Sequence, residues 1–220
     1  MPDSALTYVE LLRDPTGGSI ANWDPESDLI VEMTVRVGDY GLMTQGGSWV
    51  FFWLKKGMRF VKHGNIYKDG KATEYGIPDP VENGGDSEGE AWVTSENATR
   101  VDMSLFGRER TRFSSGQGAI LAMKDTMITS IEAPGALKRV LEDPSMRGFS
   151  IVSEVQSSAG GAIALGLPVE VSGPASVGAT AKWVKNVTSG NFKSQSDKFG
   201  KRTFYPLYKL ASLSEEGMLT

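Results

Sequence analysis

The chain contains no cysteine, and this absence removes several kinds of chemistry at once. It excludes disulfides, thiolate metal sites, cysteine nucleophiles and cysteine-linked lipids, and it fits a reducing compartment. The chain has a single histidine, His63, and no Gly-x-Ser-x-Gly sequence, so a Ser-His-Asp triad lacks most of its parts. We therefore expect a protein that is not an enzyme.

Cofactor and metal motifs are also missing. The glycines of SGQGAIL are followed by Leu121 where a dinucleotide fingerprint needs a third glycine, and no glycine loop continues into Gly-Lys-Ser/Thr. The acids between residues 77 and 90 do not have the spacing of an EF-hand, so a solvated acidic loop is the preferred interpretation. No cofactor, catalytic residue or metal ligand is predicted.

Long apolar segments are absent as well. No run of about 18 apolar residues occurs, which argues against a membrane-spanning helix. The first residues, MPDSALTYVELLRDP, place acids early and have no basic segment before an apolar one, so a signal peptide is not expected. These observations predict a cytoplasmic protein.

What the chain does contain is glycine and an uneven distribution of charge. Its 26 glycines favour strands and turns over a helical bundle, and 220 residues with 40% hydrophobic side chains suffice for a single large domain. Residues 1 to 99 carry 8 Lys/Arg against 16 Asp/Glu, whereas residues 100 to 220 carry 15 against 11. The basic second part could meet phosphate-rich partners, although chance solvation explains the split equally well.

Hydrophobic patterning predicts an α+β fold with a twisted, mostly antiparallel sheet and a few short helices. Proline at position 134 and apolar residues spaced for one face predict a helix in PGALKRVLEDP, and GAILAMKDTMITSIEA fits either a helix or strands. Strands are expected in LTYVELL (6–12), LIVEMTVRV (29–37), TRVDMSLFGRERTRF (99–113), FSIVSEV (149–155) and RTFYPLYKL (202–210), with a long acidic loop at about 77–90.

The segment SWVFFWLKK is apolar on both faces of a strand and runs directly into cations. A core strand covered on both sides accounts for the aromatic residues somewhat better than a membrane anchor does. An interfacial anchor, however, would place its rings at headgroup depth while the following cations meet anionic lipid. The aromatic residues are Trp49, Phe51, Phe52 and Trp53, and the cations are Lys55, Lys56, Arg59 and Lys62.

In GGAIALGLPVEVSG, large aliphatic residues alternate with small or polar ones. Any half-buried antiparallel strand shows this pattern, but the nine residues from 163 to 171 also reach the about 9 to 11 needed for a tilted transmembrane strand. Pro168 argues against a central position because it donates no ladder hydrogen bond. The alternating residues are Ile163, Leu165, Leu167, Val169 and Val171.

Three arginines alternate in GRERTRF and would share one face of a strand: Arg108, Arg110 and Arg112. No aromatic residue is interleaved with them, so a nucleic-acid surface is the least favoured interpretation.

Taken in order, several of these segments resemble the pore-forming N-terminal domain of the gasdermin family, and most closely the small fungal gasdermin-like proteins of regulated cell death. The resemblance covers roughly two-thirds of the chain. It lies in SWVFFWLKKGMRF, the acidic loop, the helix ALKRVLED leading into FSIVSEV, the small-residue region that follows and the closing strand RTFYPLYKL.

The resemblance implies a pore-former that is cytoplasmic when inactive and acts at the plasma membrane or another acidic-lipid membrane. Two hairpins, near 91–113 and near 149–184, would lengthen as copies oligomerise. The aromatic residues at 49–53 and the alternating aliphatic residues at 163–171 would then enter the membrane, while the cations at 55–62 bind lipid phosphate. Arg108, Arg110, Arg112, Lys138 and Arg139 are weaker candidates for lipid binding.

Two departures from the family affect the expected regulation. The predicted single domain, 1–220, ends in a short tail (211–220) without the C-terminal repressor domain of animal members, so restraint would come from the tail, a partner or an edge contact. The missing cysteine favours the fungal type, in which meeting a variant form of the same protein is a known trigger. The expected partners are acidic phospholipid and other copies, with no nucleic acid. A soluble β-rich module that binds carbohydrate or protein is the alternative.

Overall fold

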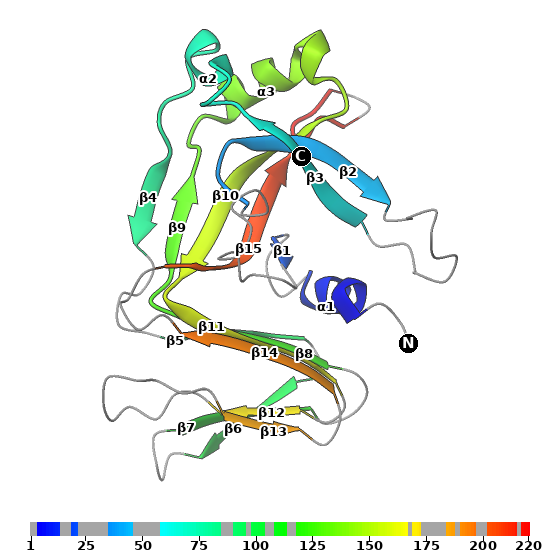
Figure 1. Ribbon diagram of the computed structural model, residues 1–220, viewed down its shortest axis with the longest axis vertical. Coiled ribbons are helices and arrows are strands. Elements are labelled where there is room, and N and C mark those ends of the chain that lie inside the picture. Colours follow the sequence, from blue (N-terminus) through cyan, green and yellow to red (C-terminus); the bar gives the residue numbers. More distant parts are fainter. Residues whose placement is uncertain are drawn as a thin grey trace.

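The computed structural model is built mainly from antiparallel strands, with a few short helices (Figure 1). This confirms the predicted α+β class. The structure describes residues 4–13, 19–21, 35–45, 58–84, 90–95, 98–103, 108–113, 118–166, 169–172, 184–187, 190–196, 202–214 and 217–220. The helices are α1 (Ser4–Leu12), α2 (Lys71–Glu74), α3 (Pro134–Glu142) and the 3-10 helix η2 (Pro144–Met146).

The strands form three antiparallel sheets. The seven-stranded sheet, here called the head sheet, consists of β1 (Ile20–Ala21), β2 (Asp39–Gln45), β3 (Met58–Asn65), β4 (Val81–Gly84), β9 (Met127–Ser130), β10 (Ser150–Ser158) and β15 (Phe204–Ala211). The upper sheet contains β5 (Glu90–Thr94), β8 (Gly118–Lys124), β11 (Gly160–Gly166) and β14 (Gly190–Ser196). The lower sheet contains β6 (Ala98–Met103), β7 (Arg108–Phe113), β12 (Val169–Ser172) and β13 (Val184–Val187).

Strand β10 is the centre of the head sheet. Along one edge it pairs with β15, and along the other it pairs first with β2 and then with β9. Strand β3 continues the sheet beyond β2, and β4 continues it beyond β9. The head thus joins strands that lie far apart in the chain.

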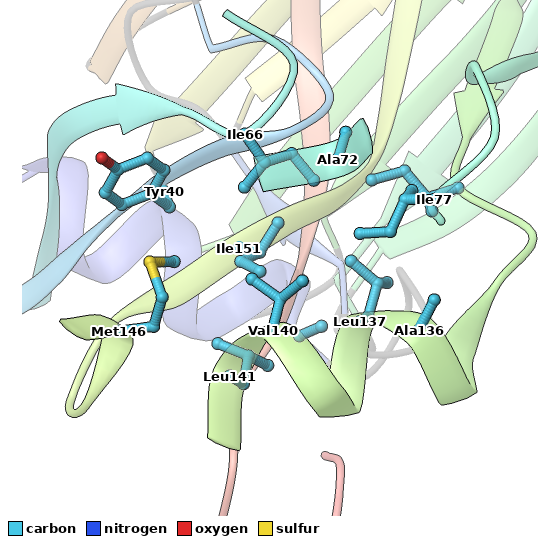
Figure 2. Packing of buried hydrophobic residues seen from close by; sticks show 12 residues of the cluster. Tyr40, Ile66, Ala72, Ile77, Ala136, Leu137, Val140, Leu141, Met146 and Ile151 are labelled. Atoms are coloured by element: carbon cyan, nitrogen blue, oxygen red, sulfur yellow. The ribbon is translucent and has the colours of Figure 1, made fainter. Parts of the chain in front are cut away.

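Helix α3 covers one part of this sheet, as its sequence predicts. Leu137 and Val140 are 2% and 0% exposed and pack with Ile66 and with Ile151 of β10 (Figure 2). Proline is tolerated in the first turn, where the lost amide would be unsatisfied anyway, and the chain turns into η2 after Asp143. The three-to-four spacing of apolar residues therefore gives both the helix and its buried face.

The predicted strand at residues 6–12 is wrong, because these residues belong to α1. Tyr8 and Leu12 stand one helical turn apart, and both are 0% exposed within a second core that includes Leu121 of β8 and Phe204 of β15. The alternation in LTYVELL is short enough to fit both periods. The helix is selected because it brings Tyr8 and Leu12, which are four residues apart, together against the sheet.

Other segments follow the predictions with local differences. GAILAMKDTMITSIEA, left open from the sequence, forms β8 and β9, and the last predicted strand is β15. The expected acidic loop contains the short edge strand β4, which pairs with β9 over four residues. The strand expected at 29–37 lies largely outside the described residues.

A partly buried hydrogen bond joins the end of α2 to the turn before η2. The Tyr75 hydroxyl donates to Asp143 Oδ2 at 2.5 Å, and the backbone amide of Ser145 donates to Asp143 Oδ1 at 2.7 Å. The bond from Tyr75, together with that from Ser145, lowers the pKa of Asp143 from 3.8 to about 2. The same bond raises the pKa of Tyr75 to about 12.

The substitution Tyr75→Phe should lower the melting temperature most between about pH 4 and pH 10. A carboxyl whose pKa is lower in the folded protein stabilises it above the unfolded pKa, so the difference from wild type should shrink as pH falls from about 4 to 2. It should also shrink as pH rises from about 10 to 12, where the folded tyrosine ionises. Thermal melting at each pH measures this.

Tyr67→Phe is the matched control, because the Tyr67 hydroxyl donates to the backbone carbonyl of Pro78 and not to a carboxylate. Its difference from wild type should stay constant between pH 4 and pH 2. An equal acid dependence in both variants would contradict the assignment to Asp143.

Candidate functional site

Two long β-hairpins extend from the head sheet and form the candidate site. In the first, the chain runs out through β5 and β6 and returns through β7 and β8. Strands β6 and β7 pair from Ala98 with Phe113 to Met103 with Arg108, and β5 pairs with β8. The hairpin therefore spans residues 90–124. It begins close to residue 91, where the family resemblance implied, and continues beyond the implied end at 113.

The second hairpin has the same construction. The chain runs out through β11 and β12 and returns through β13 and β14. Strands β11 and β14 pair without a register shift from Gly160 with Ser196 to Gly166 with Gly190. It spans residues 160–196, later in the chain than the predicted 149–184, because 150–158 belongs to β10 in the head.

The two hairpins lie side by side and share both sheets. Strand β8 pairs with β11 over seven consecutive residues, from Lys124 with Gly160 to Gly118 with Gly166. Farther out, β7 pairs with β12. The order in the upper sheet is β14-β11-β8-β5, and the order in the lower sheet is β13-β12-β7-β6, so each arm keeps its neighbours as it passes from one sheet to the next (Figure 1).

This arrangement leaves two outer edges in the part of the chain that the structure describes: β5 with β6, and β13 with β14. Edge strands present backbone donors and acceptors that can pair with another chain. The edges are also antiparallel to one another, because β5, β8, β11 and β14 alternate in direction. One copy could therefore continue the sheet of another.

The stretch Gly160 to Gly173 does not form one strand in one sheet. Ile163 and Leu165 belong to β11 in the upper sheet, and Val169 and Val171 belong to β12 in the lower sheet. Leu167 and Pro168 lie outside the described residues. The alternating sequence pattern therefore extends over two sheets. The chain passes from one sheet to the other between Gly166 and Val169, the interval that contains Pro168.

One face of the upper sheet packs against α1. Residues 118–123 of β8 are all buried, and Ala119, Leu121 and Met123 belong to the core that contains Tyr8 and Leu12. In the ladder, Ile163 stands opposite Leu121 and Leu165 stands opposite Ala119. Burial raises the pKa of Tyr8 well above its usual value, so its hydroxyl stays neutral.

The three alternating arginines all lie on β7, at the seam between the hairpins. Arg112 stands opposite Glu170 of β12, and Arg110 stands opposite Ser172. On the other side of β7, Val101 and Met103 occupy the positions opposite Arg110 and Arg108. In the lower sheet, charged and apolar residues therefore occupy directly opposite positions on neighbouring strands.

Lys62, one of the cations predicted to bind lipid, forms an ion pair within the head. Lys62 Nζ lies 2.9 Å from Asp39 Oδ1, and the Asp39 side chain is 0% exposed. Asn65 Nδ2 also donates to Asp39 Oδ1, at 2.8 Å, and the backbone amide of Arg36 donates to its other oxygen. Lys62 thus balances a buried carboxylate, a role that sequence reasoning missed because Asp39 is distant in the chain.

The two predicted cations of α3 also have contacts within the head. Lys138 lies 3.7 Å from Glu142, and Arg139 donates to the backbone carbonyl of Tyr75 at 3.1 Å. Figure 1 shows α3 at the end of the molecule opposite the lower sheet.

The predicted aromatic residues at 49–53, together with Lys55 and Lys56, lie outside the described residues. In the chain, these residues belong to the connection between β2 and β3. The ladder of these strands ends at Gln45 opposite Met58, with Arg59 opposite Thr44.

A serine that sequence reasoning missed joins the hairpins to the head. Ser158 is 0% exposed, and its hydroxyl accepts from the amides of Lys124 and Gly160 at 3.0 and 3.2 Å. The carbonyls of Lys124 and Gly160 lie 2.5 and 2.6 Å from the same hydroxyl. Next to it, Asp125 adopts a φ of 51°, where β8 turns into β9.

Neither metal sites nor membrane helices emerge from the described ranges. Within them, no group of three or more His, Asp or Glu side chains could hold a metal ion, and none of the described helices has the length and apolarity to span a membrane.

His63 stacks against Phe149 at a centroid distance of 5.1 Å and lies 5.8 Å from the ring of Tyr40.

Comparison with protein-family models gives no match, and neither does comparison with curated proteins. Among solved structures, the chain matches one described as the cryo-EM structure of the Gasdermin A3 membrane pore. The match covers 100% of this chain and 94% of that chain, at 13% sequence identity and a TM-score of 0.36. That protein belongs to the family that the sequence resembles.

The substitution Lys62→Ala should lower the free energy of unfolding by about 1–3 kcal/mol, because it leaves a buried carboxylate without its cation. Urea unfolding monitored by circular dichroism measures the change. Lys68→Ala is the control, since Lys68 is exposed on the turn after β3, and it should alter stability by less than about 0.5 kcal/mol. Unchanged stability of the Lys62 variant, with weakened vesicle binding, would instead support a lipid contact.

Proposed function

We propose that this protein permeabilises membranes by inserting its two β-hairpins. One observation carries the proposal: the hairpins are joined in register over seven residue pairs and leave two antiparallel outer edges. Each arm consists of one upper-sheet strand and the lower-sheet strand next to it in the chain. Its length exceeds the about 9 to 11 residues of a tilted transmembrane strand. A ribbon of four such arms has the dimensions of a membrane-crossing unit.

The two outer sheet edges give a physical reason for several copies to assemble. Lipid offers no hydrogen bonds, so unpaired backbone groups at an edge cost several kcal/mol each. If β14 of one copy pairs with β5 of the next, both edges are satisfied, and a closed ring leaves none. Oligomerisation and insertion are therefore coupled, and an isolated copy should not remain inserted.

Attraction to acidic phospholipid is assigned first to Lys55, Lys56 and Arg59. Each cation near an anionic surface contributes roughly 1 kcal/mol, so three bring the protein to the membrane reversibly. The aromatic residues of the same connection would then enter the headgroup region. Arg108, Arg110 and Arg112 lie on the hairpins, whereas Lys62, Lys138 and Arg139 have partners in the head and contribute less.

In the cell, such a protein would be cytoplasmic until activated and would then act at the plasma membrane or another acidic membrane. Leakage through the ring would cause regulated cell death. Activation by a variant form of the same protein is consistent with an edge that accepts a second chain. The activity needs neither a cofactor nor a catalytic residue.

Leakage from vesicles tests the function directly. Vesicles of phosphatidylcholine with phosphatidylserine should release a trapped dye, and the variant with Lys55, Lys56 and Arg59 replaced by glutamate should need at least about 100-fold more protein, because about 3 kcal/mol of attraction is lost. Lys138→Glu with Arg139→Glu should have a smaller effect. Pure phosphatidylcholine vesicles are the lipid control.

No leakage by the protein alone, with a variant form or after removal of residues 211–220 would sink the proposal. A protein that remains monomeric on vesicles would point instead to the soluble carbohydrate- or protein-binding module.

The substitution Leu165→Asp separates insertion from binding. It introduces a carboxylate near the far end of β11, opposite Ala119, and should abolish leakage while vesicle sedimentation stays as in wild type. Asn191→Asp is the comparison: it adds a carboxylate directly opposite Leu165 on β14, at a position that is already polar, and should reduce leakage less. Loss of folding by circular dichroism in the Leu165 variant would show that the position only serves the core.

A further inference from the structure

The upper sheet has an apolar face that other elements cover. On β8, Ala119 and Leu121 are 0% exposed and Met123 is 1% exposed, and on β5, Ala91 and Val93 pack against the same cluster. Directly opposite residues of an antiparallel pair share a face. The pairs of Ala91 with Met123 and of Val93 with Leu121 therefore place β5 and β8 on one continuous apolar face.

Among the described residues, β1, β15 and α1 supply the cover. Ala21 of β1 and Phe204 and Leu207 of β15 contribute side chains, but these strands are held in the head sheet by backbone ladders. Helix α1 belongs to no ladder and joins the cluster through side chains, with Tyr8 and Leu12 both 0% exposed. No strand ladder among the described residues therefore depends on α1 for a backbone partner.

We propose that α1 is the restraint on the hairpins: while it is docked, the apolar face of the upper sheet cannot meet lipid. This inference rests on the proposed pore-forming function and adds its regulation. A helix of nine residues is marginal on its own, so its stability comes from the docked face. Undocking therefore exposes the sheet and melts the helix in one step.

The C-terminal tail, in contrast, braces the head. Ser212 and Thr220 exchange two backbone hydrogen bonds of 2.9 Å, which fold the segment back on itself. Leu213 and Leu219 pack against the core cluster of α3, which does not include the residues that α1 covers. In Figure 1 this end of the chain lies near α3, away from the upper sheet. Within the described residues, the tail therefore packs against the head core and not against the core that α1 covers.

The substitution Leu12→Ala tests the restraint, because it weakens docking of α1. The protein concentration for half-maximal leakage of phosphatidylserine-containing vesicles should fall at least about threefold. In solution without lipid, the variant should bind more of the apolar dye ANS than wild type does, because the face is uncovered more often. Hydrogen exchange of residues 4–12 in the wild type should accelerate at least about tenfold on vesicle binding.

Leu141→Ala is the matched control: it makes the same change at a buried position of another nine-residue helix, in the other core. It should lower the melting temperature without lowering the concentration needed for leakage. Leu213→Ala in the tail should behave in the same way. These two variants separate loss of the restraint from general destabilisation.

Several outcomes overturn the inference. Equal sensitisation by Leu12→Ala and Leu141→Ala would assign the effect to general instability, and a Leu12 variant that binds vesicles but leaks less would make α1 part of the pore. Unchanged exchange in α1 on vesicles, or no more ANS binding than with Leu141→Ala, also contradicts it. If no variant leaks or binds vesicles, the proposed function fails, while the ANS comparison still decides whether α1 covers the sheet.

Discussion

The seven-residue ladder between β8 and β11 is the constraint on which the rest of the molecule depends. It joins two hairpins that are separated in the chain by β9, α3 and β10, and it is continued in the head by the pairing of β9 with β10. Because both hairpins are fixed to one seam, they keep the same order of arms in both sheets. The two outer edges follow directly from this.

The sequence predicted elements whose local signals agree. Helix α3 has proline at its start, an apolar stripe and a turn at its end, so period, propensity and termination all favour a helix. Strand β15 and the arms around Arg110 were equally accessible, because alternation over several residues reports strands well. The hairpin positions came from the family resemblance and not from the alternation, and the second hairpin lies later in the chain than the resemblance implied.

What failed depended on contacts between distant segments. LTYVELL fits a strand locally, and only the docking of Tyr8 and Leu12 on β8 selects the helix. Alternation from Ile163 to Val171 reports which positions share a face but not which sheet contains them, so the change of sheet was invisible. Lys62 looked like a surface cation because its partner, Asp39, lies across the β2–β3 pairing.

The junction at Ser158 has a mechanical consequence. One hydroxyl contacts backbone groups on both β8 and β11, and Gly161 nearby has no room for a side chain, since a Cβ would lie 2.4 Å from the Phe204 ring. Seven residues of strand form a rigid lever of about 23 Å beyond this point. A rotation of about 10° at the serine would move the far end by about 4 Å, close to the spacing of one strand. A small change of angle at this junction would therefore be amplified into a displacement comparable to the spacing between neighbouring strands.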